Sequence, residues 1–101
     1  MREFAANPAY IEIFIRVAVM FLVRNNLFTK EEAEFELELI KERIGFEKFI
    51  KAGGKGKFCN EPYITMIRVG ATVKKNRKQR VEVALILDRA AEHALYEFEE
   101  C

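Results

Sequence analysis

Residues 80–87, with the sequence RVEVALIL, decide the fold class of this 101-residue chain, because their hydrophobic pattern fits two kinds of secondary structure. In the first, every second residue points to one face, as in a half-buried strand; these residues are Val81, Val83, Leu85 and Leu87. Residues 63–73 (YITMIRVGATV) are rich in β-branched side chains. The polar residues 74–79 separate the two runs, so the region predicts a β-hairpin.

The second interpretation is one long helix from Gln79 to Glu99. Apolar side chains recur there with helical spacing; they are Val81, Ala84, Leu85, Ala91, Leu95 and Phe98. We prefer the hairpin, with Asp88 as the N-cap of a shorter last helix from Arg89 to about Glu99. The long helix would make the chain all-α, and it stays open as the alternative.

Before this region the sequence predicts a helix from about Pro8 to Arg24. Asn7 is a favoured N-cap, and Pro8 fits the first turn, where no backbone N–H is needed. Apolar residues cover nearly every side of this helix, so it should be buried nearly all round. A small domain has little interior for such a helix, and we expect its spare face to mediate self-association through Phe14, Val17 and Phe21. The alternative is a central helix that the rest of the chain covers.

A second helix is predicted from about Lys30 to Ile44, with Gly45 as its stop. Thr29 and Glu32 have the spacing of a capping box, although the alternation of apolar residues with glutamates over residues 34–39 also fits a strand. We therefore predict one α+β domain over residues 1–101. It consists of an N-terminal α-hairpin, a β-hairpin and a C-terminal helix.

The net charge of +1 conceals two regions of opposite sign. Residues 51–80 contain nine basic residues and one acidic residue, whereas the rest of the chain has a net charge of −7. Such a basic cluster is typical of proteins that neutralise phosphates. We predict that the chain binds nucleic acid, or another polyanion, through Lys55, Lys57, Arg68, Lys74, Lys75, Arg77, Lys78 and Arg80. A solvated hairpin tip, or pairing with the acidic helices, would explain the same charges.

The acidic helices suggest a different function. The second predicted helix carries Glu31, Glu32, Glu34, Glu38 and Glu42, and the last one carries Glu92, Glu97, Glu99 and Glu100. Part of this charge favours helix N-termini. The alternative function is a small inhibitor or adaptor that binds the basic surface of a partner protein, of the small regulatory kind that mobile elements encode.

No motif for catalysis, a metal or a cofactor is visible in the sequence. His93 is the single histidine, and no HExxH motif surrounds it. Cys59 and Cys101 are too far apart in sequence for a zinc or redox motif. The stretch AGGKGKF at residues 52–58 lacks the spacing of a phosphate-binding loop. We expect a non-catalytic protein without a cofactor or a metal.

Residues 10–23 (YIEIFIRVAVMFLV) are the one candidate for a membrane segment. A spanning helix needs about 20 apolar residues. This run is shorter and contains Glu12 and Arg16. The start of the chain also lacks the basic region and the cleavage site of a signal peptide. We expect a soluble, cytoplasmic protein.

Overall fold

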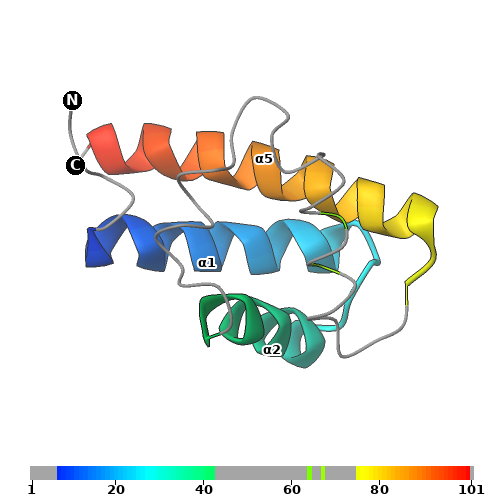
Figure 1. The fold of residues 1–101 in the computed structure, drawn as a ribbon. Helices are drawn as coiled ribbons and strands as arrows, with labels where there is room; N and C mark the ends of the chain where they lie inside the picture. The colour runs from blue at the N-terminus through cyan, green and yellow to red at the C-terminus, as the bar shows by residue number, and fades with distance from the viewer. Residues whose placement is uncertain (1–6, 43–63, 65–66, 68–74, 101) are drawn as a thin grey trace.

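A computed structural model describes residues 7–42, 64, 67 and 75–100, and its described part is built from three helices (Figure 1). Helix α1 spans Pro8–Arg24, α2 spans Lys30–Ile40 and α5 spans Arg77–Glu100. None of the described residues lies in a strand. The described part of the protein is therefore all-α, and the prediction of an α+β domain is wrong.

Helix α5 takes the place of the second predicted strand and contains residues 80–87. Burial along it follows helical spacing. Ala84 is fully buried and Leu85 is 44% exposed, whereas the predicted strand would bury Leu85 and expose Ala84. Asp88, expected to cap a shorter helix, is buried inside α5. Of the first predicted strand, only Ile64 and Ile67 are described, and both are helical and buried. The long helix that was the alternative is the one that forms.

The alanines of α5 account for this outcome. Four of them are buried in the core, namely Ala84, Ala90, Ala91 and Ala94. Alanine has the highest helix propensity, and small side chains on one face let two helices approach closely. A two-stranded hairpin, by contrast, has little stability in water unless a third element supports it.

Helix α1 begins and ends where its capping residues predict. The side chain of Asn7 accepts a hydrogen bond from the first turn. At the other end, Asn26 adopts a left-handed conformation, with φ of 59°. The N–H of Asn26 donates to the carbonyl of Val23 at 3.0 Å, and the N–H of Leu27 donates to the carbonyl of Leu22 at 3.1 Å. These bonds form a Schellman motif, which satisfies the last carbonyl groups of the helix.

Helix α2 begins with the predicted capping box. The Glu32 N–H donates to the Thr29 hydroxyl at 3.2 Å, and the Thr29 N–H donates to the Glu32 carboxylate at 2.8 Å. The inward residues are those expected for a helix: Ala33, Leu37 and Ile40 are buried. The assigned α-helix ends at Ile40, and the predicted stop at Gly45 lies outside the described residues.

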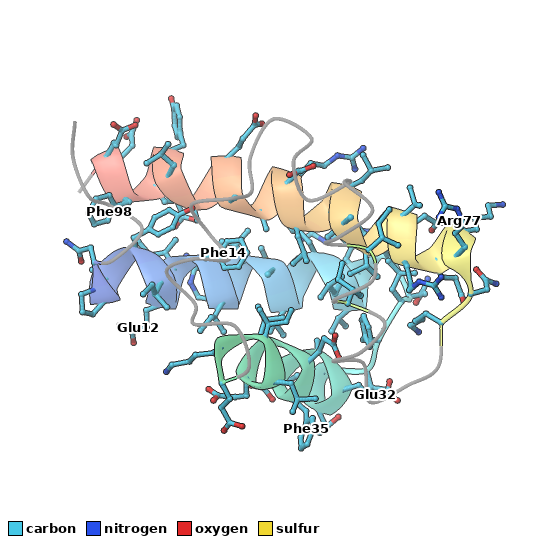
Figure 2. The ribbon with its side chains drawn as sticks, viewed as in Figure 1. Glu12, Phe14, Glu32, Phe35, Arg77 and Phe98 are labelled. Atoms are coloured by element: carbon cyan, nitrogen blue, oxygen red, sulfur yellow. The ribbon has the colours of Figure 1, made fainter. Side chains whose placement is uncertain are left out.

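Helix α1 lies between α5 and α2 (Figure 1), and it runs antiparallel to α5. The Tyr10 ring packs edge-on against the Phe98 ring, with 5.9 Å between the centroids. The Tyr10 hydroxyl also donates a hydrogen bond to the Ala91 carbonyl at 3.1 Å. Phe14 lies in the space between α1 and α5, where it is fully buried (Figure 2). Burial of a side chain of this size contributes about 1.5–3 kcal/mol.

The central position of α1 changes the role of the residues predicted for self-association. Phe14 and Val17 are fully buried in the core of the chain itself. Phe21 is half-buried, and its ring centroid lies 5.7 Å from that of His93 on α5. These side chains therefore pack within one chain, as the alternative of a covered central helix requires. Self-association of the chain itself stays a prediction.

Helix α1 is also the segment that resembled a membrane span. It has 17 residues, so it is about 26 Å long. Glu12 and Arg16 on it are exposed. Within the described ranges, no helix is both long enough and apolar enough to cross a bilayer.

Candidate nucleic-acid interface at the start of helix α5

The start of α5 is fixed by two side chains that the sequence reasoning missed. The Gln79 N–H donates to Asn76 Oδ1 at 2.8 Å, and the Asn76 N–H donates to Gln79 Oε1 at 3.1 Å. This reciprocal pair is a capping box, with Asn in the place of Ser or Thr. The spacing Asn-x-x-Gln was a signal for a helix start in residues that we interpreted as a hairpin connection.

Four of the eight predicted nucleic-acid-binding residues lie at this end of α5: Lys75, Arg77, Lys78 and Arg80. The other four, Lys55, Lys57, Arg68 and Lys74, lie outside the described residues. The capping box therefore brings half of the predicted cluster to one helix terminus. The described four divide into two pairs with different surroundings.

Lys75 attaches the start of α5 to the turn between α1 and α2. Its ammonium donates a hydrogen bond to the Leu27 carbonyl and lies 4.4 Å from the centroid of the Phe28 ring. A cation over an aromatic ring contributes about 0.5–2 kcal/mol, depending on its exposure. Lys75 is half-buried, and it uses its charge inside the chain. Binding of a phosphate by Lys75 would require these contacts to break.

Arg80 has a similar internal role. Its Nη1 donates to the Lys75 carbonyl at 2.7 Å, which ties the first turn of α5 to the residue before it. Its Nε is buried and has no acceptor in the described part of the chain. A buried donor without an acceptor costs about 1–3 kcal/mol. Arg80 therefore has a structural role at the start of α5, and its Nε is unpaired among the described residues.

Arg77 and Lys78 are the exposed pair. Both lie in the first turn of α5, and Figure 2 shows Arg77 at the amino-terminal end of the helix, away from the other labelled residues. This turn contains no acidic residue. The helix terminus itself carries about half a positive charge, which adds to that of the side chains. Two exposed basic side chains therefore lie at the amino-terminal end of α5.

The charges of α5 run against its own dipole. Cations near a helix N-terminus and anions near a C-terminus each cost a few tenths of a kcal/mol. The first turn of α5 has no acid and the last turn has no base, while Glu97, Glu99 and Glu100 lie near its C-terminus. Helix formation alone does not favour this arrangement. Binding of an anion at the N-terminal end would offset part of the cost.

The outer face of α2 is the second surface with a distinct chemistry. Glu31, Phe35 and Glu38 follow one another on it at helical spacing, Glu42 continues the row just beyond the end of α2, and all four are exposed. Phe35 is 55% exposed, and in Figure 2 it points away from α1. A large aromatic side chain in an acidic surface is a common anchor for a protein partner.

His93, the one candidate for acid–base chemistry, belongs to a surface ion-pair network. Its Nε2 lies 3.2 Å from Glu97 Oε2, and Arg16 Nη2 lies 2.8 Å from Glu97 Oε1. Arg16 is on α1, so the network joins α1 to α5. Among the described residues, no group of three or more potential metal ligands comes together. Cys59 lies outside them.

Comparison with protein families, curated proteins and solved structures found no match for this chain. Function is therefore inferred from the residues of the chain itself.

Proposed function

We propose that the protein is a non-catalytic binding protein that contacts a polyanion, in the first place nucleic acid, at the amino-terminal end of α5. The supporting observation is the exposed pair Arg77 and Lys78 at the positive end of a 24-residue helix whose first turn has no acid. Helix N-termini and basic side chains are among the groups with which proteins contact phosphates. The proposal includes a cytoplasmic location, where nucleic acid is within reach.

The expected mode of binding is charge neutralisation with little reading of bases. Arg77 and Lys78 would each contact a phosphate, because both are exposed in the first turn of α5. Affinity should therefore fall steeply with salt, by about 0.9 in log K per log unit of salt for each phosphate of duplex DNA. Lys75 supports the site by holding α5 against the α1–α2 turn, and it is not counted among the phosphate contacts.

The test is fluorescence anisotropy of labelled duplex DNA, single-stranded DNA and RNA over a salt series. The variant is Arg77→Ala/Lys78→Ala. The matched control is Lys41→Ala/Arg89→Ala, which removes two exposed cations from elsewhere on the surface. The proposal predicts that only the first variant lowers the affinity for duplex DNA, with a salt slope smaller by about 1.8.

Two outcomes would contradict the proposal. One is no binding of any nucleic acid at low salt. The other is an equal loss of affinity in both double variants, which would mean that net charge matters and this helix end does not. Circular dichroism of both variants is the folding control, and Lys75 is left unchanged in both because it contacts Leu27 and Phe28.

A second candidate function, an inhibitor or adaptor that binds a basic protein surface, is favoured by the exposure of Phe35 among glutamates on α2. Acidic residues would guide association, and the buried ring would contribute most of the affinity. The variant Phe35→Ala should lose a captured partner. Tyr96→Ala, which removes another exposed aromatic ring from α5, is the matched control and should retain it. Equal capture by both variants would exclude this face.

A further inference from the structure

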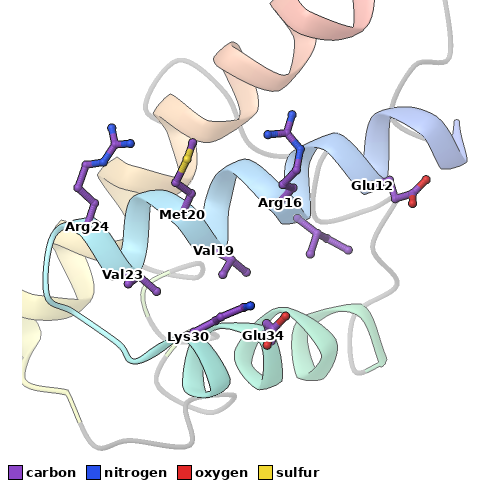
Figure 3. Close-up of a pocket in the computed structure, with 9 residues that line it drawn as sticks. Glu12, Arg16, Val19, Met20, Val23, Arg24, Lys30 and Glu34 are labelled. Atoms are coloured by element: carbon purple, nitrogen blue, oxygen red, sulfur yellow. The ribbon is translucent and has the colours of Figure 1, made fainter.

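A groove of about 630 Å³ lies between α1 and α2 (Figure 3). Its floor is apolar and consists of Ile15, Val19, Met20 and Val23. Three of these side chains are half-buried, and Met20 is 38% exposed. Helix α2 forms one wall of the groove through Lys30 and Glu34. The groove is thus the remaining apolar face of a helix that is apolar nearly all round.

The charges around this floor are ordered along the groove. On α1, Glu12 lies at one end and Arg24 at the other (Figure 3). On α2, Lys30 lies toward the Arg24 end, and Glu34 lies one turn further toward the Glu12 end. Along both helices, the groove is therefore acidic at one end and basic at the other. Arg16, between the ends, is paired with Glu97 of α5.

We propose that this groove binds the same groove of a second copy of the chain, with the two α1 helices antiparallel. A twofold axis requires a surface that is complementary to itself. If the axis passes at the level of residue 18, Glu12 of each copy meets Arg24 of the other. These two residues are 12 positions apart, about 18 Å along the helix. The apolar floors then cover each other between the two charged ends.

The polarity of the groove favours a second copy over other occupants. A ligand with one anionic group would match only the end with Arg24 and Lys30, and would leave Glu12 and Glu34 against its apolar part. A copy related by a twofold axis matches both ends at once, because each acidic end faces a basic end. Since the groove shares no residue with Arg77 and Lys78, this inference does not depend on the proposed function.

The experiment is sedimentation velocity over a concentration series with reversed charges. Glu12→Arg places two arginines together at both ends of the dimer, and Arg24→Glu places two glutamates together. Each single variant should weaken dimerisation by about tenfold or more. The double variant Glu12→Arg/Arg24→Glu restores opposite charges and should dimerise as the wild type does.

Mixing supplies a second, independent test. The two single variants, each impaired alone, should form a heterodimer with each other, because the arginines of one face the glutamates of the other at both ends. Met20→Glu, which places a charge on the apolar floor, should give a monomer. Circular dichroism shows that each variant is folded.

Three results would overturn the proposal. The first is a wild-type chain that remains monomeric at every concentration, in which case the groove is open to a ligand or a different protein. The second is a dimer that neither single reversal weakens, since its interface would lie elsewhere. The third is a mixture of the two single variants that does not associate.

Discussion

Helices α2 and α5 begin in the same way but with opposite charge. Each starts with a reciprocal capping box, Thr29 with Glu32 in α2 and Asn76 with Gln79 in α5. The first turn of α2 then carries acids and follows the helix dipole, whereas the first turn of α5 carries bases and opposes it. The helix dipole therefore explains the charge at the start of α2 and does not explain the charge at the start of α5, which the proposed polyanion would use.

The comparison also shows what holds α5 in place. Its charges do not favour the helix at either end, so its stability comes from its capping box, from packing on α1 and from contacts with the α1–α2 turn. Tyr10 makes the contact near the C-terminal end of α5, and Lys75 makes the contact at the start. Variants that remove each contact in turn measure how much packing contributes to the stability of α5, apart from its charge.

The largest expected effect concerns Tyr10 at alkaline pH. Burial raises the pKa of the Tyr10 hydroxyl from 10.0 to about 12, because the ionised form would lose its hydration. The pKa in the folded chain is therefore above that in the unfolded chain. The stability that this difference contributes is complete below pH 10 and is lost as the pH rises from about 10 to about 12. The loss should reach about 2–3 kcal/mol.

The measurement is the free energy of unfolding by urea as a function of pH, compared with Tyr10→Phe. The variant lacks the hydrogen bond to Ala91, so it should be less stable by about 1 kcal/mol at neutral pH. Its curve should fall less steeply above pH 10, because no phenol has to ionise at this position. Parallel curves for the two proteins would show that Tyr10 ionises as easily in the folded chain as in the unfolded one.

The next effect separates the two kinds of cation at the start of α5. Lys75→Met keeps most of the side-chain length but removes the ammonium over Phe28 and its hydrogen bond to Leu27. We expect a loss of about 1–2 kcal/mol in the free energy of unfolding. Lys78→Met removes an exposed cation and should leave stability unchanged within about 0.5 kcal/mol.

Nucleic-acid affinity should respond in the opposite order. Under conditions where both variants are folded, Lys78→Met should weaken binding and Lys75→Met should affect it little. If Lys75→Met weakened binding more than Lys78→Met without a change in stability, the internal contacts of Lys75 would not be those of the protein in solution.

The ends of α1 and the start of α2 could be predicted because their signals are local. Asn7, Thr29 and Glu32 bond to groups within three residues of them. The fold class could not be predicted with the same security, because residues 80–87 satisfy both a strand and a helix pattern. The choice between them depends on buried alanines that pack in the core with distant residues. The spacing of Asn76 and Gln79 is a local signal that favours the helix.

The sequence predicts the basic charge of the candidate site, but it does not predict which basic residues are exposed and which make contacts inside the chain. The sequence showed a basic cluster that includes Lys75 and Lys78. It could not show that Lys75 contacts Leu27, which is 48 positions earlier in the chain. Nor could it show which face of α1 is partly exposed. Phe14 and Val19 are both apolar, and only the packing of α5 and α2 buries one more deeply than the other.

The smallest effect tests the comparison of α2 and α5 directly. Lys78 and Glu31 occupy the same position in their helices, two residues after the capping residue. Lys78→Glu should stabilise the chain by about 0.3–1 kcal/mol, and Glu31→Lys should destabilise it by a similar amount. Both changes in the free energy of unfolding should become smaller in high salt, because salt screens exposed charges.

These two variants also link stability to binding. Lys78→Glu should make the protein more stable and weaken its binding of nucleic acid, whereas Glu31→Lys should make it less stable and leave binding at the start of α5 intact. A gain in stability together with a loss of affinity is the expected mark of a charge that is present for a ligand. If Lys78→Glu instead destabilised the chain, the positive charge at this position would belong to the fold, and the contrast between the two helices would disappear.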